Sequence, residues 1–185
     1  MRLETHYLQH LAAGYDRDAV LEELMQQYGG DLWRFAYFLT KRADAADDVV
    51  QEVFLAVYER MYAFRGESSV RGWLLAMTRN KSYSYLKTAF VRKVTLMDVM
   101  DVGSPSPSAE NELLFREDAR ELWDAVLGLP LKFREVLILD YHYGLSIKEI
   151  ASLLQLSEGT VKSRSHRAKG KLARLLKAPK GVDQI

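Results

Sequence analysis

Hydrophobic side chains recur every three or four positions along most of the chain, which is the spacing of an amphipathic α-helix. Residues 32–41 are the most apolar of these segments and include Trp33 and Phe35, so they are expected at the centre of a core. The Gly/Pro/Ser-rich stretch 101–108 cannot continue a helix. We therefore predict an all-α protein of two small helical domains, joined by a flexible linker. The predicted N-terminal domain covers residues 15–93, the linker 94–110 and the C-terminal domain 111–179.

The N-terminal domain is expected to contain four helices. The first covers residues 18–28 and ends at Gly29 and Gly30, because glycine commonly follows the last turn of a helix. The apolar segment described above forms the second. Asp44 is expected to cap a third helix that ends near residue 62, since a short acidic side chain can accept hydrogen bonds from free N–H groups. A loop then leads into a fourth helix over residues 70–90.

The C-terminal domain is expected to begin with helices over residues 112–127 and 131–143, which are followed by a helix-turn-helix. In the first helix of that motif Ile147, Ile150, Ala151 and Leu154 have the i, i+3, i+4, i+7 spacing of one buried face. Ser146 and Ser157 precede the two helices as predicted caps. The spacing predicts a pair of crossed helices, of which the second is the recognition helix.

The recognition helix has two distinct faces when it is plotted at about 100° per residue. Val161, Ser165, Ala168 and Leu172 form the stripe predicted to face the scaffold. Recognition helices present the opposite face to base edges in the major groove, and flanking basic residues hold phosphates. The predicted base-reading residues are Ser163, His166 and Arg167, and the predicted phosphate-side residues are Thr160, Lys162 and Arg164. The alternative interpretation is an amphipathic helix with a solvated basic face.

Basic and acidic residues are concentrated in different segments of the chain. The 26 basic and 25 acidic residues give a net charge of +1, yet residues 159–180 contain no acidic residue and residues 44–52 are strongly acidic. The absence of cysteine excludes disulfides and thiolate metal sites. No apolar run approaches the roughly 20 residues of a membrane span, so we expect a cytoplasmic protein without membrane insertion of its own. Phosphate-loop, nucleophile and metal-ligand motifs are absent, so we expect neither an enzyme nor a cofactor or metal site.

Several segments together resemble the extracytoplasmic-function (group IV) sigma factors of bacterial RNA polymerase, which belong to the sigma-70 family. In the C-terminal half these are Leu129–Leu137 (LPLKFREVL), Ser146–Ala151 and Gly159–Ala168 (GTVKSRSHRA). In the N-terminal half Ala46–Leu55 (ADDVVQEVFL) resembles the family's polymerase-binding helix. Phe64–Gly66 and Ser69–Asn80 (SVRGWLLAMTRN) resemble its promoter −10 segment. The resemblance covers residues 18–177 in matching order.

The resemblance implies an alternative sigma factor that binds core RNA polymerase and directs initiation at promoters with −10 and −35 elements. It implies partners at the β′ clamp helices and the β flap, promoter DNA and an anti-sigma factor. Asp48, Gln51, Glu52 and Leu55 share one helical sector and are the predicted polymerase-binding residues; ordinary solvated acids are the alternative. The predicted −10 residues combine basic and aromatic side chains, which suit single-stranded DNA; for the tyrosines a place in the core is the alternative. These residues are Arg65, Ser68, Arg71, Arg79, Asn80, Lys81 and Tyr83.

Two positions depart from the family pattern. Ser84 and Tyr85 stand where the family usually has an Asp-Arg-type pair, and Ser165 stands where it usually has Leu or Ile. The serine is expected to weaken packing of the recognition helix by about 1 kcal/mol. An autonomous helix-turn-helix regulator is the alternative function. It would bind duplex promoter DNA without polymerase, which a titration with and without core enzyme distinguishes.

Overall fold

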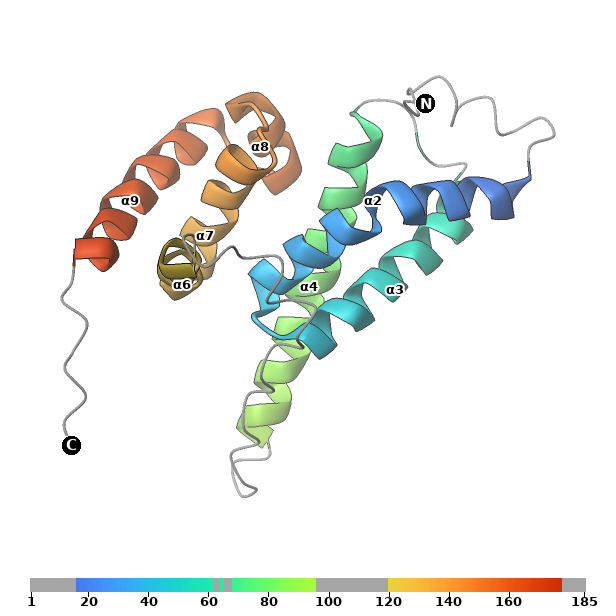
Figure 1. Ribbon diagram of the computed structural model, residues 1–185, viewed down its shortest axis with the longest axis horizontal. Coiled ribbons are helices and arrows are strands. Elements are labelled where there is room, and N and C mark those ends of the chain that lie inside the picture. The colour runs from blue at the N-terminus through green and yellow to red at the C-terminus, as the bar shows by residue number, and fades with distance from the viewer. Residues whose placement is uncertain (1–15, 62–63, 65–67, 96–119, 178–185) are drawn as a thin grey trace. The chain divides into compact units, whose positions relative to one another are not determined.

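The structure is a computed structural model that describes residues 16–61, 64, 68–95 and 120–177, with the side chains of 91–95 left out. Contacts divide the chain into two compact units, residues 1–106 and 107–185. The described residues of both units are helical and contain no strand, which confirms the all-α prediction (Figure 1). The predicted linker lies outside the described residues except for its first two, which continue the last helix of the N-terminal unit.

Three long helices build the N-terminal unit: α2 (Arg17–Thr40), α3 (Ala43–Arg60) and α4 (Val70–Thr95). Each of them contacts the other two, and α3 returns alongside α2 in Figure 1. The Asp16 carboxylate caps α2 by accepting a hydrogen bond from the Asp18 N–H at 2.9 Å. Leu24, Phe35 and Leu74 are fully buried between the helices. This core holds the exposed faces of α3 and α4 in fixed positions.

The prediction that a helix ends at Gly29–Gly30 is wrong, because α2 continues through both glycines as one helix of 24 residues. Leu24 lies before the glycine pair and Leu32 after it, and both side chains are fully buried. Burial of a leucine contributes about 1.5–3 kcal/mol, whereas a glycine inside a helix costs about 1 kcal/mol relative to alanine. Packing of both halves against α3 and α4 therefore outweighs the local preference of the glycines.

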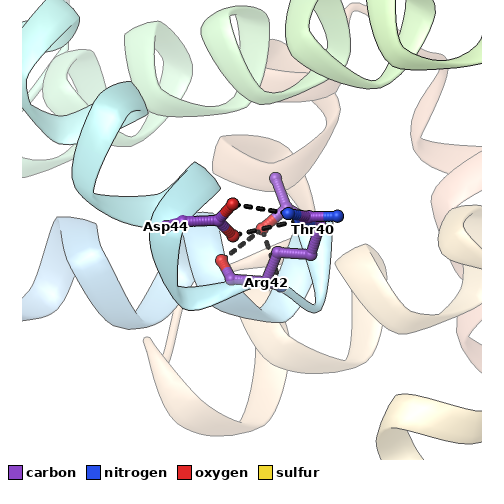
Figure 2. Close-up of polar contacts among 3 residues, drawn as sticks. All are labelled: Thr40, Arg42 and Asp44. Carbon is purple, nitrogen blue, oxygen red and sulfur yellow. Dashed lines mark hydrogen bonds and ion pairs between the residues drawn. The ribbon is translucent and has the colours of Figure 1, made fainter. Parts of the chain in front are cut away.

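The turn between α2 and α3 is stabilised by three polar side chains (Figure 2). Lys41 adopts a left-handed conformation (φ 61°) and ends α2. The buried Thr40 hydroxyl donates to the Ala36 carbonyl at 2.8 Å, and its oxygen accepts from the Arg42 N–H at 3.3 Å. Arg42 is the N-cap residue of α3 and donates two side-chain hydrogen bonds to Asp44, at 3.0 and 2.5 Å.

The predicted N-cap role of Asp44 is therefore wrong, since Asp44 lies inside the first turn of α3 and its carboxylate is held by Arg42. Hydrogen bonding to the Arg42 guanidinium lowers the pKa of Asp44, which keeps the carboxylate charged near the positive end of the helix. The acidic start of α3 is retained although the capping geometry differs from the prediction.

Five helical segments form the described part of the C-terminal unit: α6 (Arg120–Gly128), α7 (Leu131–Leu137), the π-helical segment η4 (Ile138–His142), α8 (Ile147–Leu154) and α9 (Glu158–Lys177). Leu129, Phe133 and Leu137 pack against Ala168 of α9. Gly144 has φ 66° and ends the second predicted helix where the sequence indicated. The predicted helix 112–127 is described only from residue 120 onward.

Candidate nucleic-acid interface

Side-chain caps begin both helices of the helix-turn-helix, as predicted. In α8 the Ser146 hydroxyl accepts from the Glu149 N–H at 3.3 Å, and the Glu149 carboxylate accepts from the Ser146 N–H at 2.8 Å. The Ser146 hydroxyl also donates to the Glu149 carboxylate at 2.6 Å, and this bond, followed by the one from the Ser146 N–H, lowers the pKa of Glu149. Before α9 the Ser157 hydroxyl accepts from the Thr160 N–H at 3.2 Å. Between the helices, Gln155 adopts a left-handed conformation with φ 55°.

The faces of α9 match the predicted rotation of the recognition helix. Val161, Ser165 and Ala168 are buried, and Leu172 packs at the edge of the core. Lys162, His166 and Arg167 are exposed. The buried stripe is therefore confirmed, and the predicted base-reading face is open to a ligand.

Two of the predicted base-reading residues contact each other. The Arg167 guanidinium donates to the Ser163 carbonyl and to the Ser163 hydroxyl, each at 3.3 Å. The Ser163 hydroxyl in turn donates to the Thr160 carbonyl at 3.0 Å. Arg167 thus lies along the exposed face of α9 beside Ser163, with its charge close to the N-terminal half of the helix.

Arg164, a predicted phosphate-side residue, lies differently from Lys162. Its guanidinium is 3.4 Å from a carboxylate oxygen of Glu135 on α7, and the Glu135 side chain is only 1% exposed. Lys162 points to solvent on the other flank of the helix. Of these two predicted phosphate-side residues, Arg164 is therefore paired within the protein and Lys162 is exposed to solvent.

The predicted polymerase-binding residues all lie on the exposed side of α3. Asp48, Gln51 and Glu52 are exposed, and Leu55 is exposed over 65% of its surface. The same helix buries Phe54 and Val57 on its other side. A shallow groove beside Gln51 and Leu55 also involves Met25 of α2, another exposed apolar side chain. We name the four predicted residues the acidic face.

The predicted −10 residues that the structure describes differ in their partners. The Arg79 guanidinium lies 4.4 Å from the centre of the Tyr83 ring, so these two residues are together. Arg71 is instead bonded to Asp31 of α2 at 2.9 Å. Burial raises the pKa of Asp31, but the Arg34 and Arg71 guanidinium groups outweigh it, so the pKa lies below its usual value. Lys81 forms an ion pair with Glu52. Asn80 and Ser68 are exposed, and Arg65 lies outside the described residues.

Among the described residues, no group of three or more His, Cys, Asp or Glu side chains is arranged to hold a metal ion. None of the helices within these ranges is both long and apolar enough to cross a bilayer.

Comparison with known protein families finds one match in each half of the chain. The family described as sigma-70 region 2 matches residues 24–89, and the family described as sigma-70, region 4 matches residues 119–172. SigX of Bacillus subtilis, an ECF RNA polymerase sigma factor, is 30% identical over 78% of this chain and 77% of its own. SigL of Mycobacterium tuberculosis, another ECF sigma factor, is 33% identical over 81% of this chain and 85% of its own.

The chain belongs to the ECF sigma factors. It is an alternative sigma factor that directs transcription initiation, and its region 4 helix-turn-helix is a DNA-binding element. Among solved structures, the sigma factor RpoE in complex with the anti-sigma factor NepR from Bartonella quintana has a TM-score of 0.72 and 25% identity. That similarity covers 87% of this chain and 99% of the other.

One surface of this sigma factor was not predicted from the sequence. An apolar groove of about 460 Å³ lies between α6, η4 and α9, with Leu122, Tyr141 and Leu176 exposed at its edges and Leu172 in its wall. On the helical wheel of α9 the groove residues lie well away from Ser163 and Arg167. Leu176, which falls outside the predicted buried stripe, was the signal in the sequence for a second apolar surface.

Proposed function

We propose that this sigma factor contacts promoter DNA through α9 and α4, and core RNA polymerase through the acidic face and the groove beside α9. In this assignment α9 reads the −35 element, and the surface around Arg79 and Tyr83 takes the opened −10 element. The acidic face binds the β′ clamp helices, and the apolar groove binds the β flap. The observation that carries the proposal is the exposed basic face of α9 opposite a fully buried stripe.

The chemistry of each surface supports its proposed partner. Asp48 and Glu52 beside the apolar Leu55 suit a basic partner helix with apolar positions. Arg79 over the Tyr83 ring combines a positive charge with an aromatic face, which suits unpaired bases and their phosphates. In this proposal residues 15–93 and 111–179 are the two functional domains, without catalytic activity or cofactor, and the protein acts with RNA polymerase in the cytoplasm. An anti-sigma factor is the proposed regulator, by similarity to the RpoE complex with NepR.

Reconstitution with core polymerase tests the proposal. The full chain should give promoter-specific transcripts with core enzyme, and reversal of the acidic-face charges should abolish them. The free chain should bind duplex promoter DNA weakly, because its net charge of +1 reflects an acidic surface that offsets the basic recognition helix. Nanomolar specific binding of duplex DNA by the free chain at physiological salt would instead favour an autonomous regulator.

A further inference from the structure

Two of the polar contacts between α9 and the scaffold lie on opposite sides of Val161 and Ala168. On one side Arg164 is paired with Glu135 of α7 at 3.4 Å. On the other side the Ser165 hydroxyl donates to a carboxylate oxygen of Asp140 in η4, also at 3.4 Å. Arg164 and Ser165 are consecutive, so they project about 100° apart around the helix axis. Val161 and Ala168 fill the space between the two contacts.

The apolar stripe determines which face of α9 packs on the scaffold, because Val161 and Ala168 are fully buried. Apolar contact has little directional preference, so these two small side chains restrain small rotations of the helix less than polar contacts do. Hydrogen bonds and ion pairs depend on direction. A polar contact on each side of the stripe opposes rolling in both directions. Ser165, where the family usually has Leu or Ile, is the residue that makes the second contact available.

The two acids lie in different kinds of helix, Glu135 in α7 and Asp140 in the π-helical segment η4. Glu135 and Asp140 are five residues apart, which places them about 140° apart around a regular α-helix. The Tyr143 N–H instead bonds to the Ile138 carbonyl at 3.1 Å, an i→i+5 hydrogen bond that widens the turn. The widened turn contains Asp140 but not Glu135, and such segments are frequent at functional sites. The carboxylates on both sides of the start of this segment contact α9.

We propose that Glu135 and Asp140 are positioning residues for −35 recognition. Through Arg164 and Ser165 they fix the rotation of α9 and so determine which of its side chains face the bases. This inference rests on the proposed −35 role of α9. It also gives Arg164 a function within the protein, in place of the predicted contact with a phosphate.

The two roles of Arg164 predict opposite results for the nearly isosteric Glu135→Gln variant. Glu135 is buried and cannot touch DNA. If Arg164 is a positioning partner, loss of the Glu135 charge should lower the preference at one or two −35 positions by about three- to tenfold, within the discrimination of one base contact. The salt dependence of binding should not change. If Arg164 holds a phosphate, Glu135→Gln should release it. Binding should then tighten at every −35 sequence, and the salt dependence should rise by about one counterion.

The experiment uses the full chain with core polymerase and a promoter library randomised at the −35 element. Glu135→Gln, Arg164→Ala and their double variant should change the same positions to a similar extent, since all three break the contact between these two residues. Arg164→Lys should restore much of the preference because a lysine can also pair with Glu135. Asp124→Asn, an exposed carboxylate on α6, is the matched control. An unchanged preference in Glu135→Gln overturns the proposal.

Ser165→Ala keeps the test decisive if Glu135→Gln fails to fold. It removes only the hydroxyl that bonds to Asp140, and it should broaden the −35 preference without altering the salt dependence. If Ser165→Ala keeps the wild-type −35 preference, the contact between Ser165 and Asp140 has no positioning role. Arg167→Ala separates this inference from the proposed function: if that variant changes the preference while the Glu135 and Ser165 variants do not, α9 reads the bases but is positioned by other contacts.

Discussion

The Lys81 ammonium lies 3.0 Å from a carboxylate oxygen of Glu52, so an ion pair joins α4 to α3. Glu52 belongs to the acidic face proposed for polymerase, and Lys81 belongs to the residues proposed for the −10 element. The side chains are 59% and 37% exposed, so water and salt weaken their attraction. The two proposed surfaces therefore meet at this ion pair. A partner that binds Glu52 would release Lys81 to contact DNA.

A double-mutant cycle should detect this pair as a small, salt-sensitive coupling. Glu52→Gln and Lys81→Gln should show a coupling in the free energy of unfolding of about 0.2–1 kcal/mol, the usual range for exposed pairs. Chemical denaturation at low and high salt measures it. Glu22→Gln combined with Lys81→Gln is the control, because Glu22 lies on α2 and accepts a hydrogen bond from Gln26. Coupling of equal size in the control would show that Glu52 has no specific role.

Reversal of the acidic face should weaken polymerase binding without unfolding the protein. Asp48→Lys with Glu52→Lys replaces two exposed acids, so the core under α3 stays intact while the attraction to a basic partner becomes repulsion. Affinity for core enzyme, measured by competition, should fall at least tenfold. Glu22→Lys with Asp124→Lys makes the same change in net charge elsewhere. Wild-type affinity in the Asp48/Glu52 variant would contradict the assignment of this face.

Arg167→Ala should change which −35 sequences are preferred. Arg167 is exposed beside Ser163, opposite the buried stripe. A bidentate arginine–guanine contact discriminates by about 1–3 kcal/mol, so its loss should flatten the preference at one or two positions and reduce transcription from the cognate promoter. Selection from a −35 library by reconstituted holoenzyme measures this. An unchanged preferred sequence would mean that other side chains read the bases.

Lys162→Ala should weaken binding to all −35 sequences alike. Lys162 is exposed on the flank of α9, where the DNA backbone runs beside the groove. Loss of one phosphate contact should reduce the salt dependence of binding by about one counterion. Affinities over a range of salt concentrations give this slope. Lys177→Ala, at the far end of the same helix, is the matched control, and a sequence-selective effect of Lys162→Ala would reject the phosphate role.

Removal of the α8 cap should destabilise the C-terminal unit in a pH-dependent way. Ser146→Ala should cost about 1 kcal/mol, typical for loss of an N-cap. The pKa of Glu149 is lowered below 4.5 by its bonds to Ser146, so its contribution to stability is present above that pH and is lost as pH falls through the folded-state value. The stability difference between wild type and Glu149→Gln should therefore vanish in acid. Thermal unfolding between pH 7 and pH 3 would show it, with Asp124→Asn as the control.

Local signals predicted the helix-turn-helix well because both of its helices are capped by nearby serine side chains. Ser146 and Ser157 form the predicted caps, and the i, i+3, i+4, i+7 pattern gave the buried stripe of α9. The predictions at Gly29–Gly30 and Asp44 failed because contacts between helices decided those positions. Propensity describes a residue among its neighbours in sequence and contains no information about a distant helix that packs on it.

Pairings between distant residues were the part that the sequence could not supply. Arg164 and Glu135 are 29 residues apart, and their pairing depends on the crossing of α7 and α9. Ser165 is similar: the expected loss of packing is accompanied by a bond to Asp140, which lies in a π-helical segment that was not predicted. Residue type and spacing predicted which face of α9 is exposed, but not which exposed or flanking charges are already engaged within the protein.

The glycine pair inside α2 also has a consequence for the order of folding events. The 24 residues of this helix span roughly 36 Å, and two central glycines cost about 2 kcal/mol relative to alanines. A peptide of residues 17–40 in water should therefore form short, separate helical stretches. A single straight helix arises only when Leu24 and Leu32 dock on their neighbours. We therefore predict that the continuous α2 forms late in folding, and that hydrogen exchange at its central amides reports loss of the whole three-helix unit rather than local fraying.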